Sequence, residues 1–290
     1  MSQTVAFLDF ETTGLSPQNG DRPTEVAVVF VQSQQIVDRF QSLINPGQRI
    51  PDFIVGLTGI TNSMVSSAPS AESVMRKLYG KIQNVPIVAH NASFDRKFLE
   101  TELSRIGRHH GNDICCSMRV ARRIYPDAPN HKLGTLVDHA GLTFSGRAHR
   151  AMADAEMTAR LWIEMEKQLE DKFGLPYVPF ELMGRLQQTA KRNAKSCIRE
   201  FAKNYDFDNQ TPYAEDRDSV AKNKRPQKKS ISTSPEGHVS QPPKPEPARP
   251  MMAIVCITCE NEFQEEDNGH RRWIRCPGCG FKTPRYAIGR

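Results

Sequence analysis

The chain has 290 residues, enough for one sizeable hydrophobic core and a small second unit. Its formal net charge of +6 is compatible with a polyanionic partner such as nucleic acid, although charge alone does not identify one. The sequence has no run of about 20 apolar residues, which a membrane-spanning helix would need. A signal peptide is not expected either, because Asp9 and Glu11 interrupt the only early apolar stretch. We therefore expect a soluble, cytoplasmic protein with no membrane partner, and association with the nucleoid is compatible with this expectation.

The first part of the chain has the pattern of three strands. Residues 5–8, 25–31 and 36–44 are rich in branched and aromatic side chains, and turn residues separate them. Three strands in such close succession indicate that the sheet begins with antiparallel neighbours.

Helical patterns dominate after residue 71. Apolar residues recur at helical spacing over 71–82, residues 86–89 form a further apolar strand, and helical spacing returns over 94–106. More helices are predicted over residues 119–125, 133–140, 151–169 and 182–205. Strands followed by helices that pack around them predict a mixed α/β sheet with flanking helices.

Composition divides the chain into four segments. We predict a first domain over residues 1–170, a helical basic extension over 171–205, a disordered linker over 206–250 and a small domain over 251–290. The basic face of the extension is read either as a solvated helix surface or as a contact with nucleic acid. The linker is poor in aromatics and ends in a proline-rich run, so it cannot bury enough apolar surface to order itself.

The first candidate site residues are two acids at the end of the first strand. Asp9 and Glu11 are two positions apart, and a strand directs such residues to the same face. Paired carboxylates at a strand end favour a divalent cation, but an acid pair at an exposed strand edge has the same pattern.

Three more polar residues extend this set. Asp95 follows a second apolar strand and is expected in the first turn of a helix, after a capping Asn91 or Ser93. Asp154 is expected near the start of a later helix, and His149 precedes it by five positions. Five helical steps would point the two side chains about 140° apart, so joint action requires His149 to lie on a loop before the helix.

The order of these residues resembles the motifs of the DEDDh family of 3′–5′ exonucleases, with Asp9 and Glu11 first, then Asp95, then His149 and Asp154. This family includes the proofreading subunit of bacterial DNA polymerase III. The resemblance covers roughly residues 3–167. It implies a ribonuclease-H-like fold, which agrees with the strands and helices predicted above. The related branch with tyrosine in place of the histidine is disfavoured, because no Tyr lies near Asp154.

The resemblance also implies a mechanism with two Mg²⁺ or Mn²⁺ ions. Asp9 would bind both ions, Glu11 and Asp154 would complete the site of the attacking water, and Asp95 would serve the second ion. His149 is the candidate general base, because imidazole titrates near neutral pH. The alternative interpretation is that His149 is a surface loop histidine without a catalytic role.

Four further residues are implied as contacts of the terminal nucleotide. Backbone groups of Thr12, Thr13 and Gly14 would lie beside it, and Leu57 would form an apolar wall of the base pocket.

The end of the chain has the spacing of a zinc site. Cys256 and Cys259 form one CxxC pair, Cys276 and Cys279 form another, and sixteen residues separate the pairs. Four thiolates leave no open coordination position, so we predict one structural Zn²⁺ in a zinc ribbon. The remaining Cys115, Cys116 and Cys197 are expected to be free thiols.

The sequence thus predicts a metal-dependent 3′–5′ exonuclease that acts on DNA, favouring single-stranded ends, and releases 5′-mononucleotides in repair or proofreading. A polymerase or repair protein is its expected partner. One alternative is an exoribonuclease that trims RNA 3′ ends. The other, ranked lower, is an inactive module that binds nucleic acid or a polymerase.

Overall fold

A computed structural model describes residues 3–143 and 149–208, together with the backbone of five short strand segments at 211–212, 251–255, 262–266, 273–275 and 282–284. The chain divides into two units, Met1–Arg225 and Pro226–Arg290. Within the described residues, no helix is long and apolar enough to cross a membrane.

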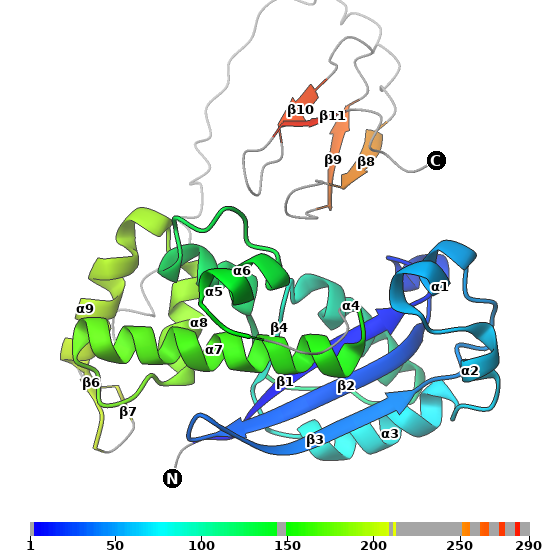
Figure 1. Cartoon of the computed structure of the whole chain (residues 1–290), viewed down its shortest axis with the longest axis horizontal. Helices are drawn as coiled ribbons and strands as arrows, with labels where there is room; N and C mark the ends of the chain where they lie inside the picture. Colours follow the sequence, from blue (N-terminus) through cyan, green and yellow to red (C-terminus); the bar gives the residue numbers. More distant parts are fainter. Residues whose placement is uncertain are drawn as a thin grey trace, which may run out of the picture. The chain divides into compact units, whose positions relative to one another are not determined.

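The first unit is built on a five-stranded sheet with the order β3-β2-β1-β4-β5 (Figure 1). Its strands are β1 (Val5–Thr12), β2 (Pro23–Gln32), β3 (Gln35–Leu43), β4 (Ile87–Ala89) and β5 (Ile114–Cys116). β1, β2 and β3 pair antiparallel, which confirms the predicted start of the sheet, and β4 and β5 run parallel to β1. β5 was not predicted, because its three residues form too short an apolar run, whereas β4 was predicted from the longer run 86–89.

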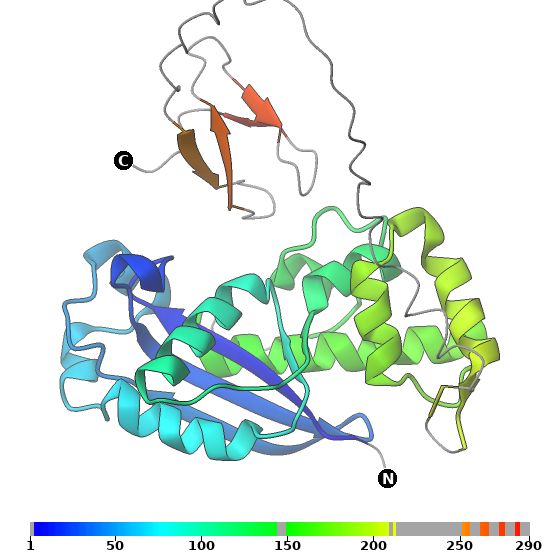
Figure 2. The same ribbon diagram turned by 180° about the vertical axis from the view of Figure 1, so that it is seen from behind.

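Alternation along β1 decides which side chains face which helices. Leu8 and Phe10 join the core under α3 (Ala71–Ile82) and α4 (Ser93–Arg105). Phe7 joins the core on the opposite face, under the long helix α7 (Ala151–Phe173). Figure 1 shows α7 lying across the sheet, and Figure 2 shows α3 and α4 from behind. Because side chains alternate, Asp9 and Glu11 lie on the α7 face with Phe7.

The remaining helices of this unit pack beside α7 or near the ends of the strands. They are α1 (Asp52–Thr58), α2 (Asn62–Ser66), α5 (Ser117–Ile124), α6 (Leu133–His139), α8 (Phe180–Gln188) and α9 (Ala194–Asn204). The short helices α1 and α2 were not predicted, since neither is long enough to show helical periodicity.

The single helix predicted over residues 182–205 was wrong, because the chain breaks into α8 and α9 there. Thr189 has extended dihedral angles (φ −75°, ψ 141°), and its carbonyl accepts a hydrogen bond from Arg123 Nε over 2.7 Å. That contact replaces the helical hydrogen bond of the carbonyl. A short 3₁₀ turn, Lys191–Asn193, leads into α9.

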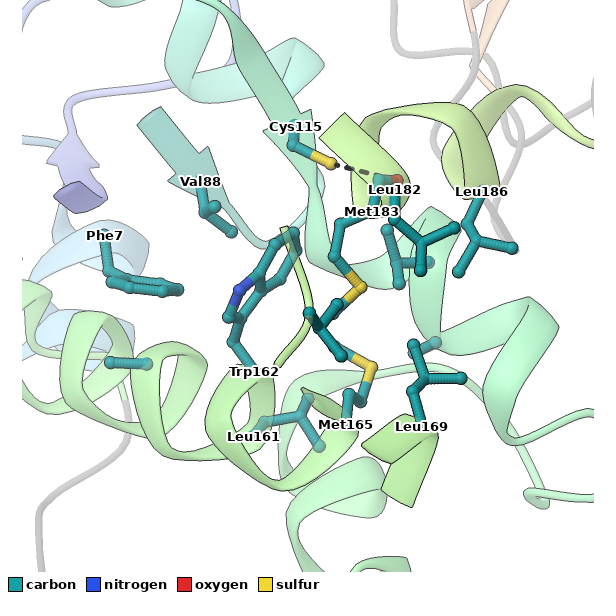
Figure 3. Packing of buried hydrophobic residues seen from close by; sticks show 14 of the residues in the cluster. Phe7, Val88, Cys115, Leu161, Trp162, Met165, Leu169, Leu182, Met183 and Leu186 are labelled. Atoms are coloured by element: carbon teal, nitrogen blue, oxygen red, sulfur yellow. Dashed lines mark hydrogen bonds between the residues drawn. The ribbon is translucent and has the colours of Figure 1, made fainter. Parts of the chain in front are cut away.

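The core on the α7 face joins α8 to the sheet. Phe7 packs edge-on against Trp162 at 6.0 Å between ring centroids, and Met165 and Met183 fill the space beyond (Figure 3). The Cys115 thiol, a free thiol as predicted, donates to the carbonyl of Met183 over 3.7 Å. α8 therefore belongs to the same core as the sheet.

The described strands of the second unit form two antiparallel pairs. β8 (Met251–Val255) pairs with β9 (Glu262–Glu266), and β10 (Trp273–Arg275) pairs with β11 (Lys282–Pro284). A short pair in the first unit joins β6 (Tyr205–Asp206) to β7 (Thr211–Pro212). The four cysteines predicted to bind zinc, Cys256, Cys259, Cys276 and Cys279, lie outside the described residues, as does most of the predicted linker over 206–250.

Candidate active site

Three of the predicted acids converge at the end of β1. Carboxylate oxygens of Asp9, Glu11 and Asp154 lie within 4.8 Å of one another. Oxygen ligands at about 2.1 Å from a Mg²⁺ ion lie about 3–4 Å from one another. The three carboxylates could therefore bind such an ion after small side-chain adjustments. Carboxylates are also the ligand type that Mg²⁺ and Mn²⁺ prefer.

Asp95 joins this group from the other side of β1. It lies in the first turn of α4, its carboxylate accepts a hydrogen bond from the backbone N–H of Phe10 over 3.1 Å, and it is 3% exposed. Helix α4 begins at Ser93 and its N-cap position is Ala92, which makes no side-chain cap hydrogen bond, so neither Asn91 nor Ser93 is the N-cap residue.

His149 lies next to Asp154, before the helix that carries this acid. Its backbone N–H donates to Asp154 Oδ2 over 3.2 Å, and α7 begins two residues later at Ala151. This confirms the geometric requirement that the histidine precede the helix. His149 has a φ of +60°, a left-handed conformation that non-glycine residues rarely adopt.

The acids disfavour one another's charged forms. Burial, followed by repulsion from Asp95, Asp154, Glu11 and Glu25, raises the pKa of Asp9 well above its usual value. Burial and the same kind of repulsion raise the pKa of Glu11 to about 8. Burial also raises the pKa of Asp95 to about 7 and moves that of Asp154 upward. A bound cation would offset this repulsion, since it favours the ionised carboxylates.

The predicted nucleotide contacts differ in exposure. Thr12 and Thr13 are buried, and the Thr13 hydroxyl accepts from the backbone N–H of Arg22 over 3.0 Å and from Gln48 Nε2 over 2.9 Å. A Cβ at Gly14 would lie 2.4 Å from the Asp21 carboxylate, so a larger residue there would have to displace the Asp21 side chain. Leu57 is 50% exposed on α1.

Two residues beside the acids were not singled out from the sequence. Glu25 is fully buried on β2 directly opposite Glu11, and Arg150 forms a two-point ion pair with it. The sequence feature that could have indicated Glu25 is that it is the only acid near the start of an otherwise apolar strand. Its partner could not be read from the sequence, because Arg150 lies 125 positions away.

Comparison with known families decides the assignment of this site. Residues 6–162 match the model of the exonuclease family, RNase_T. The chain belongs to this exonuclease family. The matched residues include the three clustered acids, Asp95 and His149, so residues 6–162 form a 3′–5′ exonuclease domain.

Several characterised proteins resemble this domain. The 3′-5′ exonuclease DinG of Bacillus subtilis is 34% identical over 187 residues, which cover 64% of this chain and 20% of that protein. A PolC-type DNA polymerase III of Caldanaerobacter subterraneus is 37% identical over 163 residues, which cover 56% of this chain and 12% of that protein. The chain therefore spans only a small part of the length of these relatives.

Solved structures share the fold of this exonuclease domain. Exonuclease X in complex with 5′ overhanging duplex DNA is 28% identical, with a TM-score of 0.50 and coverage of 63% of this chain and 99% of that one. The nuclease domain of 3′hExo, a DEDDh family member bound to rAMP, has a TM-score of 0.52 at 22% identity, with coverage of 61% and 96%. The second likeness shows the fold alone. Both agree with the predicted mixed α/β architecture.

Proposed function

We propose that this chain hydrolyses DNA from its 3′ end and releases 5′-mononucleotides, in repair or proofreading. The observation that carries the proposal is the convergence of Asp9, Glu11 and Asp154 beside Asp95, with His149 held at Asp154. An inactive binding module would not need to keep all four acids and the histidine.

The proposed roles follow from these positions. Asp9, at the centre of the acids, would bind two Mg²⁺ or Mn²⁺ ions, Glu11 and Asp154 would share one of them, and Asp95 would serve the other. When bound, such ions activate water as a nucleophile and neutralise charge on the phosphate. His149 would accept the proton of the attacking water.

The proposed nucleotide contacts lie near this end of β1. We propose that backbone groups of Thr12, Thr13 and Gly14 face the terminal nucleotide. The buried Thr13 hydroxyl supports a backbone role, because its bonds to Arg22 and Gln48 already occupy its acceptor positions. The exposed side chain of Leu57 is available to a base.

DNA is favoured over RNA by the names of the relatives. PolC-type DNA polymerase III and Exonuclease X with duplex DNA are the more similar proteins, whereas the structure bound to rAMP is 22% identical. RNA trimming is therefore the second candidate. The PolC likeness also favours a polymerase or repair partner, and we propose a cytoplasmic location.

The deciding experiment compares substrates under one set of conditions. Purified protein with Mg²⁺ is incubated with 5′-labelled single-stranded DNA, duplex DNA with a 3′ overhang, and RNA of the same sequence. We expect stepwise shortening of DNA from the 3′ end and no reaction in EDTA. Faster shortening of RNA would support the alternative, and no shortening of any substrate would overturn the nuclease proposal.

We also propose that the second unit is a zinc ribbon that raises the affinity for substrate or partner without taking part in hydrolysis. In the sequence, Cys256 follows β8 directly and Cys276 follows β10, so each CxxC pair falls between two paired strands. A four-cysteine zinc ribbon requires two such CxxC pairs.

A further inference from the structure

The buried carboxylate of Glu25 makes four hydrogen bonds beside the candidate active site. Arg150 donates from Nε over 3.0 Å and from Nη2 over 2.7 Å, which is the two-point geometry of an arginine–carboxylate pair. The backbone N–H of Ala151 donates over 3.0 Å, and Gln41 on β3 donates over 2.9 Å. A carboxylate with this many donors is fixed in position.

These contacts supply the missing cap of α7. Arg150 is the N-cap residue, but its side chain does not cap the helix, so the first backbone N–H of α7 would lack a partner. Glu25 accepts that N–H, and its negative charge at the N-terminus of α7 also suits the helix dipole. The start of α7 is thereby attached to the central part of the sheet.

His149 is consequently held on both sides. On one side its own N–H binds Asp154 Oδ2, and on the other side the next two residues bind Glu25. The left-handed conformation of His149 costs free energy in a residue with a side chain and persists only where neighbouring contacts enforce it. The Glu25 contacts are placed to enforce it.

The ion pair also keeps Glu25 charged beside the other acids. Glu25 lies directly opposite Glu11, and Arg150 places its guanidinium on this carboxylate. Burial raises the pKa of Glu25, but the bonds from Arg150, Ala151 and Gln41 outweigh burial and leave this pKa below its usual value. Glu25 therefore acts as a permanent anion held by donors.

We infer that Glu25 and Arg150 are positioning residues, which hold His149 beside Asp154 so that its imidazole reaches the attacking water. This inference rests on the proposed exonuclease function. Neither residue would contact the reacting atoms, and each acts through the backbone of residues 149–151.

The test is a double-mutant cycle between Arg150 and His149, measured as single-turnover hydrolysis of labelled single-stranded DNA by the full chain. Arg150→Ala should lower the rate by about 100-fold, the scale at which a misplacement of about 1 Å acts. In the His149→Ala background, the same substitution should lower the rate by less than about 3-fold, because the residue through which it acts is gone. Arg150→Lys, which keeps the charge but not the two-point contact, should be intermediate.

Two controls separate positioning from general damage. Arg39→Ala removes an arginine of β3 that also ties the sheet to α7, through its pair with Glu156. This variant should leave the rate unchanged. Mn²⁺ affinity, measured by calorimetry without DNA, should change by less than about 3-fold in Arg150→Ala, because the clustered acids remain.

The outcomes distinguish failure of the positioning role from failure of the exonuclease proposal. Equal rate losses in both backgrounds, an unchanged rate in Arg150→Ala, or lost Mn²⁺ binding would overturn the positioning role while leaving the exonuclease proposal intact. A wild-type chain without activity on DNA or RNA would overturn the exonuclease proposal, and the positioning role with it.

Discussion

The backbone N–H of Phe10 donates to the Asp95 carboxylate over 3.1 Å. Phe10 lies beyond the last residue of β1 that pairs with β4, since that register ends at Phe7 and Val88. Asp95 therefore takes the place of a strand partner and brings a fourth acid to Asp9 and Glu11.

Asp95→Asn should separate this structural role from catalysis. The amide oxygen still accepts the Phe10 N–H, so folding is retained, and loss of one repelling charge should leave the metal-free domain as stable or more stable. Hydrolysis should fall by at least about 100-fold, as when one group that stabilises transition-state charge is removed. Thermal unfolding and rate measurements on the same sample check both statements, and a normal rate would remove Asp95 from the site.

His149→Ala should reduce hydrolysis by a factor of about 100 to 10,000, the range in which positioned proton transfer contributes. Asp9→Asn should reduce it by at least about 100-fold, because it removes a carboxylate that would hold the metal ions. Both variants should fold, because neither side chain belongs to the hydrophobic clusters of the core. Single-turnover rates in Mg²⁺ and circular dichroism test this. Near-normal turnover by either purified variant would contradict the assigned role.

The stability of the metal-free protein should fall as pH rises from 7 to 8. The pKa of Glu11 is raised from 4.5 to about 8, so the folded state holds its proton more tightly than the unfolded state and loses stability as that proton leaves. A full difference of one proton changes stability by about 1.4 kcal/mol per pH unit. Histidines with lowered pKa, such as His90, are neutral in both states over most of this window.

Melting temperatures in EDTA measure this effect. Glu11→Gln should show a smaller fall between the two pH values, and Mn²⁺ should reduce the fall in the wild type because it favours ionised carboxylates. The fall will not vanish in the variant, since the pKa of Glu166 is also raised to about 8 by burial. A melting temperature that rises over this window without metal would contradict the arrangement.

Arg22→Ala should destabilise the domain by about 2–3 kcal/mol, somewhat less than the loss for a fully buried ion pair. Arg22 binds Glu102 through two bonds of 2.8 and 3.0 Å, and the Glu102 side chain is only 2% exposed, so it would keep a buried charge without its main partner. The matched control is Arg76→Ala, which breaks an exposed pair with Glu72 and should cost less than about 0.5 kcal/mol. Urea unfolding measures both, and equal losses would contradict the distinction.

Removing the second unit should spare hydrolysis. A chain that ends at Pro212 keeps Phe207 packed against Tyr177 and Tyr205, at centroid distances of 5.4 and 5.0 Å, so the exonuclease domain stays intact. Its rate on saturating short DNA should match the full chain, with weaker binding of long DNA or of a partner. Loss of turnover on saturating substrate would refute the accessory role.

Zinc content tests the ribbon separately. The full chain should carry one zinc per molecule by elemental analysis, and Cys276→Ser should lose it, because a structural four-cysteine site requires all its thiolates. Unchanged zinc in this variant would contradict the predicted site.

The sequence by itself determined the local relations among the candidate site residues and the order of most of the main elements. Asp9 and Glu11 share a face because a strand has a period of two, and His149 had to precede its helix because five helical steps would turn it away from Asp154. These are local relations, which residue spacing fixes before the chain folds.

Only the tertiary structure decided how distant residues meet. The Phe10–Asp95 bond spans 85 positions and the Arg150–Glu25 pair spans 125, and no local pattern specifies either. The same holds for the break between α8 and α9, where Arg123 donates a hydrogen bond to the Thr189 carbonyl. Such partners depend on which faces pack together, and packing is settled by the burial of the whole core.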